Sequence, residues 1–330
     1  MKVVSRSRLG SAILSVALLF CASSLPARAA EGSFDRTLKV TGAVDLDVTT
    51  GSGSVTVRSG QASAVIIHGE IRARSGWGFS DSEAERKVRA LVADPPIQQV
   101  GNIIRIGHIN DRSLFQNVSI SYELVVPKES QLASQTGSGN QTIEGIRGPL
   151  KVRTGSGRIN ISNIEEEVRA ETGSGDIEVH ALHAGVRLNA GSGSIKGEGV
   201  GGSIVAGTGS GNLKLSQTAP GPVRLETGSG SAEITGVSGS LHARTGSGSI
   251  TAQGEPTGDW NLQTGSGNLT VRVPSEAAFD LHAHTGSGQV SSEHSITMQG
   301  NLSRHELRGK VRGGGSMVEL VTGSGNIRIE

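Results

Sequence analysis

Cysteine is nearly absent from the sequence. The single copy, Cys21, lies in an N-terminal segment that has the features of a secretory signal peptide, so the mature chain would contain no cysteine and no disulfide. An exported chain can fold without disulfides when its core is long and continuous. Aromatic residues are also scarce, at 2% of the chain. This scarcity indicates a narrow core filled by Ala, Val, Ile and Leu.

Long apolar runs are missing as well. The apolar stretch from Ala12 to Cys21 is too short to span a membrane. Basic residues precede it, and Ala27-Arg28-Ala29 fits the small-x-small cleavage rule, so residues 1–29 are predicted to be a signal peptide. Lipidation at Cys21 is the alternative, but Phe20 precedes it where a small residue is expected. The mature chain is therefore expected in the periplasm, at the cell surface or secreted, without a transmembrane span.

Neither sign of charge dominates. The sequence has 31 Lys and Arg against 30 Asp and Glu, and the predicted signal peptide contains four of the basic residues and no acidic ones. The mature chain thus has 27 basic against 30 acidic residues, a net charge of −3. This is not the strongly basic balance of a nucleic-acid-binding protein, so no nucleic-acid partner is expected.

What the sequence has in abundance is one tetrapeptide, Thr-Gly-Ser-Gly. The copies begin at Ala190, where alanine replaces the threonine, and at Thr50, Thr136, Thr154, Thr172, Thr208, Thr227, Thr245, Thr264, Thr285 and Thr322. From Thr136 to Thr285 the copies are 18 to 21 residues apart, and one step of 37 residues follows. A repeat of this length is the signature of a solenoid.

Apolar residues recur around the motif. When its threonine is counted as zero, positions −4, −2, +5 and +7 are apolar in most copies. This alternation predicts one strand on each side of the motif, each with one buried face. The change from even to odd positions inside Gly-Ser-Gly predicts a corner, for which glycine with positive φ is suited. The expected inner positions include Leu150, Val152, Ile159, Ile161, Val168, Ile177 and Val186.

The motif is therefore expected to be structural. Its threonine would point inward, and coils stacked about 4.8 Å apart would let successive threonines hydrogen-bond to one another in a ladder. The corner residues singled out in three coils are Thr154, Gly155, Gly157, Thr172, Gly173, Gly175, Thr245, Gly246 and Gly248.

The chain is predicted to be all-β, a parallel β-helix-like solenoid with about 18–19 residues per coil and one domain over residues 30–330. A short inserted helix is predicted over residues 81–93, because Ser82-x-x-Glu85 resembles a capping box and Pro95-Pro96 follows. It is expected to cover one end or side of the solenoid. Regular coils are expected over residues 131–330, with residues 293–317 forming one coil without the motif.

The sequence also resembles a known family. The resemblance rests on the repeated Thr-Gly-Ser-Gly-x-Ile-x-Val and on the run Ile120-Ser121-Tyr122-Glu123-Leu124-Val125-Val126-Pro127. These features are similar to the bacterial putative-adhesin domain, a domain of unknown function, and to the head domain of auto-transporter adhesins. The resemblance covers nearly all of the mature chain. It implies a right-handed, adhesin-like solenoid at the cell envelope, and it brings no established catalytic residues.

No catalytic or metal-binding constellation stands out. A phosphate loop needs a helix after its glycines, whereas a strand follows here, and a nucleophile elbow needs Gly-x-Ser-x-Gly with a partnered base. A calcium-binding repeat needs Asp after the glycines, and only Asp176 stands there. His282 and His284 share an outward face, but zinc usually takes three or four ligands and no third is evident. No metal and no cofactor are expected.

A candidate ligand surface lies on the strand before the motif. Position −3 points outward between two buried positions, and stacked coils would align it into a column. Its basic or titratable members are Lys151, Arg169, Arg187, Arg224, His242 and His282. Such a column could meet the carboxylates or phosphates of an envelope polysaccharide or another anionic surface polymer. The alternative is a solvated face whose charges are paired by Glu171 and Glu226 at position −1.

These features favour an exported, non-catalytic β-solenoid that presents its long side as a binding or adhesive surface. A polysaccharide-active β-helix enzyme is one alternative, although the acidic residues are scattered among the coils rather than clustered. A purely structural envelope rod is another. Ice binding through a flat threonine array is disfavoured, because the motif threonines are predicted to point inward.

Overall fold

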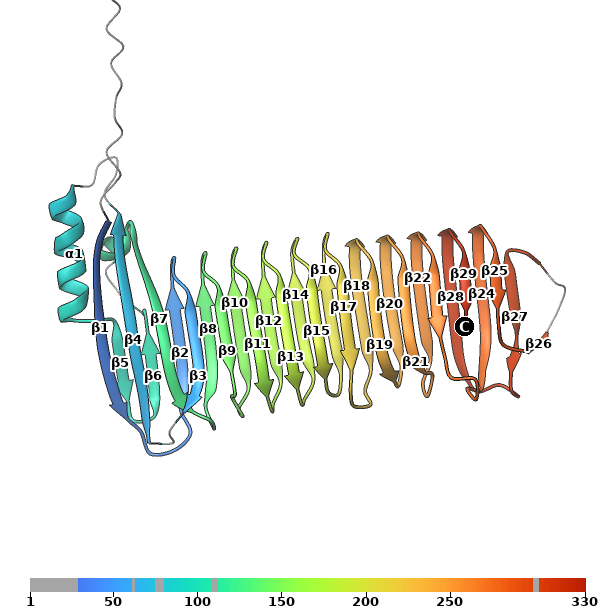
Figure 1. The fold of residues 1–330 in the computed structure, drawn as a ribbon, viewed down its shortest axis with the longest axis horizontal. Helices are drawn as coiled ribbons and strands as arrows, with labels where there is room; N and C mark the ends of the chain where they lie inside the picture. The colour runs from blue at the N-terminus through green and yellow to red at the C-terminus, as the bar shows by residue number, and fades with distance from the viewer. Residues whose placement is uncertain (1–28, 61–62, 75–79, 109–111, 299–302) are drawn as a thin grey trace, which may run out of the picture.

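The computed structural model describes residues 29–60, 63–74, 80–108, 112–298 and 303–330. They form a long rod of two β-sheets with one α-helix at the N-terminal end (Figure 1). Within these ranges no helix is long and apolar enough to cross a membrane. The predicted signal peptide lies outside the described residues, except for Ala29.

The first sheet, called sheet A, has 14 strands in the described part of the chain. In spatial order they are β1 (Ala29–Lys39), β4 (Ala64–Arg74), β7 (Val118–Pro127), β3 (Val55–Gly60), β9 (Gln141–Glu144), β11 (Ile159–Ile164), β13 (Ile177–Leu182), β15 (Ile195–Val200), β17 (Leu213–Gln217), β19 (Ala232–Ser238), β21 (Ile250–Glu255), β23 (Leu269–Arg272), β29 (Ile327–Ile329) and β25 (Val290–Ser292).

The second sheet, called sheet B, has 15 strands over the same ranges. In spatial order they are β26 (Ile296–Met298), β27 (Glu306–Val311), β24 (Phe279–Ser287), β28 (Ser316–Ser324), β22 (Trp260–Ser266), β20 (Leu241–Ser247), β18 (Val223–Ser229), β16 (Ile204–Thr208), β14 (Val186–Ala190), β12 (Val168–Thr172), β10 (Leu150–Thr154), β8 (Gln131–Thr136), β2 (Asp45–Thr50), β6 (Ile103–Ile106) and β5 (Ile97–Val100). Outside the sheets lie α1 (Asp81–Ala93) and a short 3-10 helix, η1 (Arg112–Phe115).

Each regular coil contributes one strand to each sheet, and equivalent residues of neighbouring coils pair in parallel. Thr154 of β10, for example, lies opposite Thr136 of β8 and Thr172 of β12. The predicted inner positions are at most 3% exposed: Leu150, Val152, Ile159, Ile161, Val168, Ile177 and Val186. The core therefore runs along the rod between the two sheets, and the predicted all-β solenoid of alternating strands is confirmed.

The corner glycines are needed for a different reason from the predicted one. Gly248 has a positive φ of 148°. Those without a left-handed φ are Gly155, Gly157, Gly173, Gly175 and Gly246. Instead, neighbouring coils approach so closely that a Cβ on Gly175 would lie 1.8 Å from the carbonyl oxygen of Gly157. At most of these corners the neighbouring coil, rather than the backbone conformation, excludes a side chain.

The motif threonines are buried, but the predicted ladder between them is wrong. The Oγ1 of Thr154 donates to the carbonyl of Gly139 in the neighbouring coil at 3.1 Å and accepts from the amide of Gly157 at 3.0 Å. The same donation to a glycine carbonyl of the neighbouring coil is made by Thr172, Thr208, Thr227, Thr245, Thr264, Thr285 and Thr322. Each hydroxyl thus ties two coils together through the backbone, and Ala190 lacks it.

The coils at both ends of the rod are stacked out of chain order. The coil of β2 and β3 lies between β6 and β7 on one side and β8 and β9 on the other. The last coil, β28 and β29, lies between β22 and β23 and the preceding coil, β24 and β25. The described part of residues 293–317 does not form the predicted coil, because β27 and β26 pair antiparallel beyond β24. At the other end β1, β4 and β7 are also antiparallel.

The inserted helix is present as α1 with the predicted bounds, but its N-cap lies two residues before the predicted capping box. Ser80, not Ser82, is the N-cap, and its side chain accepts a hydrogen bond from the amide of Glu83. The helix ends at Ala93, before Pro95. Its buried face lies against β1, where a Cβ on Gly32 would approach Val88 to 2.6 Å. The helix therefore covers the edge strand at this end of the rod (Figure 1).

Candidate functional site

The outward face of sheet B brings the predicted −3 residues into one column. Lys151, Arg169 and Arg187 lie directly beside one another on β10, β12 and β14. Val205 follows on β16 and interrupts the run of cations. Arg224 and His242 then occupy β18 and β20.

His282 does not join the cationic part of this column. Because the last coil is inserted out of order, Glu319 lies between Asn261 and His282. The ring of His282 faces carboxylate oxygens of Glu306 at 3.5 Å and Glu319 at 3.9 Å. The guanidinium of Arg308 also contacts the ring, at 3.3 Å, so His282 lies among charges of both signs.

The charges on the outward faces of the two sheets differ. From β8 to β22 the strands of sheet B carry six Lys or Arg residues against two Glu. From β9 to β23 the strands of sheet A carry three Lys or Arg residues against five Glu. The three cations of sheet A are paired: Lys196 with Glu198 at 2.7 Å, Lys214 with Glu233 at 3.1 Å and Arg272 with Glu330 at 2.8 Å.

Two glutamates neutralise part of the face of sheet B. The carboxylate of Glu171 contacts the Nε of Arg169 at 2.6 Å and the Nε of Arg153 at 2.9 Å. Burial raises the pKa of Glu171, but the hydrogen bonds and charges of Arg169 and Arg153 outweigh it, so the pKa is lowered overall. Glu226 pairs in the same way with Arg224. Among the described residues, no ion pair is formed by Lys151 or Arg187.

His242 adds no charge to the face near neutral pH. Burial lowers its pKa below the ordinary value of 6.5, and the nearby charges of Arg224 and Arg244 lower it further. The guanidinium of Arg244 donates to the side-chain oxygen of Gln263 at 2.6 Å. The distal half of the face is thus more nearly neutral than the segment from Lys151 to Arg187.

A shallow hollow runs beside the cationic segment, over the motif corners. Its outward side chains, at position −1, are Gln135, Arg153, Glu171 and Asn189. A similar hollow continues along the distal coils, lined at position −1 by Glu226, Arg244, Gln263 and Val321. Both hollows exist because the first glycine of each motif leaves no side chain above the backbone.

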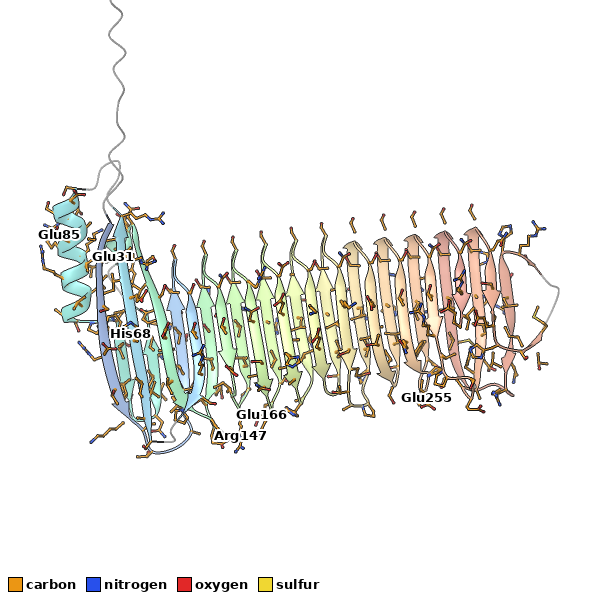
Figure 2. The ribbon with its side chains drawn as sticks, in the orientation of Figure 1. Glu31, His68, Glu85, Arg147, Glu166 and Glu255 are labelled. Carbon is orange, nitrogen blue, oxygen red and sulfur yellow. The ribbon has the colours of Figure 1, made fainter. Side chains whose placement is uncertain are left out.

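Some of the turns along one long edge of the rod carry acidic residues, most densely at residues 165–167. Figure 2 shows Arg147, Glu166 and Glu255 along this edge. Arg147 bridges Glu129 and Glu165 on the neighbouring turns, at 3.0 Å from each. The cationic segment of sheet B is therefore bordered by an acidic turn just before β12, and this turn narrows the surface open to an anionic ligand.

A second polar column was missed in the sequence. The residue after the motif accepts a hydrogen bond from the backbone amide of the next coil: Asn140 from Arg158, Asp176 from Ser194, Asn212 from Ser231, Asn268 from Asn326 and Asn326 from Gln289. The recurrence of Asn, Ser and Asp at this position could have revealed it. Asp176, the one residue in a calcium-like position, also contacts Arg158 at 3.6 Å. Its carboxylate thus takes part in holding neighbouring coils together.

Comparison with known proteins gives a family but no function. No curated protein matches the sequence. A crystal structure of a putative adhesin from Parabacteroides distasonis is 10% identical, with 91% of this chain and 97% of that chain covered and a TM-score of 0.37. The crystal structure of a putative adhesin from Bacteroides fragilis is 11% identical, with 91% of this chain and 97% of that chain covered and a TM-score of 0.33. That of a putative cell adhesion protein from Clostridium sporogenes is 12% identical, with 91% of this chain and 99% of that chain covered and a TM-score of 0.20. The family described as Toastrack DUF4097 matches residues 165–330, half of the sequence, and the chain belongs to this family.

Proposed function

We propose that the protein is an exported, non-catalytic rod that binds anionic polymers of the cell envelope through the outward face of sheet B. The supporting observation is the uneven distribution of charge. The mature chain carries a net charge of −3, yet the strands of this face carry six basic residues against two acidic ones. A positive face on a negative protein attracts polyanions to one side of the rod.

The two acidic residues of this face argue against a polysaccharide-cleaving site there. Acid-base cleavage of a glycosidic bond uses a pair of carboxyl groups, one with a raised pKa so that it can act as the acid. Glu171 instead has a lowered pKa and is held between two arginines. Glu226 lies on a different coil and is paired with Arg224.

The proposal is tested by changing one face at a time. Replacing Lys151, Arg169 and Arg187 by serine is expected to abolish binding to polygalacturonate, while dextran serves as the uncharged polymer. The matched control replaces Lys196, Lys214 and Arg272 on sheet A and should retain binding. Binding of the parent should weaken as the ionic strength is raised from about 0.01 M to about 0.15 M.

Three outcomes would overturn the proposal. The first is a parent protein that binds no polyanion, which leaves a structural rod. The second is equal loss of binding in both face variants. The third is release of reducing ends from the polymer, which would indicate an enzyme.

Export is tested separately. N-terminal sequencing of the protein from the producing cells should start at Ala30, with cleavage after Ala29. A lipid attached at Cys21 would replace this proposal with a membrane-anchored chain.

A further inference from the structure

The cations of the segment from Lys151 to Arg187 are not equivalent. Lys151, Arg169 and Arg187 occupy the same position on three successive strands, and all three side chains are exposed. Arg169, in the middle, is engaged by Glu171. Glu171 is shared with Arg153, so one carboxylate contacts two of the four cations in this segment. The two outer cations, Lys151 and Arg187, have no ion-pair partner among the described residues.

The unpaired cations therefore lie two coils apart rather than one. Coils in a parallel stack repeat at the strand spacing, so Lys151 and Arg187 project from points about 9.5 Å apart along the rod axis. A ligand that satisfies both must present anionic groups at twice the strand spacing on one side.

An extended acidic polysaccharide has this arrangement. In a linear chain of uronic acids with two-fold character, successive sugars turn their carboxylates to opposite sides, so that the carboxylates on one side recur at every second sugar. A polyphosphate, by contrast, carries its charges far more densely and gains little from two separated cations.

The hollow beside the cations supplies the rest of a polysaccharide site. Gln135 and Asn189 line it at its two ends, and both are exposed amides able to exchange hydrogen bonds with hydroxyl groups. The hollow runs along the rod axis, because its lining comes from the same position on β8, β10, β12 and β14. A polymer lying in it would cross the strands and pass each cation in turn.

We infer that Lys151 and Arg187 are a spaced pair of anchors for a linear polyuronate lying along this hollow, with alternate carboxylates bound. The inference rests on the proposed function and narrows it to three coils and one charge spacing. The distal cations Arg224 and Arg244 lie outside these three coils; Arg224 is paired with Glu226, and Arg244 donates a hydrogen bond to Gln263.

The test moves one cation without changing the charge of the face. Val205 lies beside Arg187 in the same column and is partly exposed. The variant K151S/V205K keeps the net charge but places the unpaired cations on adjacent coils. Titration with polygalacturonate should show that K151S weakens binding at least about tenfold and that adding V205K does not restore it. The control K196S/K214S, which removes two charges from sheet A, should stay within about twofold of the parent.

The outcomes separate this inference from the proposed function. If K151S/V205K binds like the parent, the spacing is irrelevant and the inference is wrong, although the face still binds polyanions. If polyphosphate, at equal concentration of anionic groups, binds more tightly than the polyuronate and depends on the same residues, the ligand is a phosphate polymer and the inference is also wrong. If no variant of sheet B changes binding, both proposals fail. Melting temperatures of all variants should match the parent, since the substituted side chains are not buried.

Discussion

The middle of the rod and its two ends are built from similar coils but are assembled differently. Between β8 and β23 the coils stack in chain order with parallel strands, whereas at each end one coil is inserted out of order. The contact between coils is nevertheless the same. Thr322 donates to the carbonyl of Gly267, and Thr285 donates to that of Gly325, as equivalent threonines do in the middle. The motif thus determines how two coils meet, but not which two coils meet.

The ends also differ from the middle because the stack of coils must terminate there. A parallel stack ends in open strand edges that could pair with another chain. At the N-terminal end α1 packs on β1, and the ammonium of Lys87 reaches the carbonyl of Gln116 at 3.2 Å. At the C-terminal end the antiparallel strands β27 and β26 extend sheet B beyond β24. The ends therefore use irregular sequence where the middle uses the repeat.

The largest expected effect breaks the close stacking of the middle. Replacing Gly175 by valine should destabilise the fold by about 3 kcal/mol or more, because its Cβ would overlap a backbone carbonyl that cannot move alone. The control is Gly51→Val in the first motif copy, where a Cβ would have no atom within 4 Å. Urea unfolding followed by circular dichroism measures both. A Gly175→Val protein as stable as Gly51→Val would contradict the stacking argument.

The next effect tests whether coils are interchangeable at the end. Deleting residues 316–330 removes the coil between β22 and β24. Since the contact surfaces repeat, the coil of β24 and β25 is expected to dock directly on that of β22 and β23, giving a rod one coil shorter and less stable. Hydrogen exchange should then show protected amides over residues 279–287. Free exchange there, with the middle still protected, would show that the last coil is a specific partner.

A smaller effect adds the missing contact in the middle. Ala190→Thr places a hydroxyl beside the carbonyl of Gly175 and should stabilise the protein by about 1 kcal/mol. The reverse change, Thr172→Ala, removes such a bond and should destabilise it by a similar amount or more. Melting temperatures measured side by side give the two signs. Equal shifts in one direction would refute the role given to the hydroxyl.

The smallest expected effect is a difference between the N-terminal end and the middle of the rod in how stability depends on pH. At the N-terminal end, the hydrogen bond that the His68 ring donates to the carboxylate of Asp35 raises the pKa of His68 above 6.5, so its contribution to stability is present below pH 6.5 and is lost as the pH rises through the folded-state value. In the middle, burial lowers the pKa of His242, so stability is retained above pH 6.5 and lost as the pH falls through it. His68→Asn and His242→Asn should each remove one of these opposite slopes from the melting temperature between about pH 5 and 8. Each change should be below about 1 kcal/mol, because both groups are partly solvated.

The sequence alone determined the period, the strand positions and the inward-facing residues. Alternation around the motif placed Leu150, Val152 and Ile159 in the core correctly, because in a stack of equivalent coils each side chain has the same environment in every repeat. The helix was also predicted from a capping pattern and the prolines that follow it, although the N-cap is Ser80 rather than Ser82. The column of outward cations followed from the same alternation.

Tertiary structure alone decided the order of the terminal coils, the reason for the glycines and the state of each charge. Equivalent coils fit one another equally well, so the repeat does not indicate which coil packs against which. Only the 37-residue step between the last two motif copies indicated an irregularity at the displaced coil. The motif glycines are required because backbone atoms of another coil approach them closely, and no local sequence pattern indicates this approach. Whether Arg169 is paired and Arg187 is not depends on which side chains meet across the sheet. That selection is made by packing in three dimensions, because ion pairs form between coils as well as along one strand.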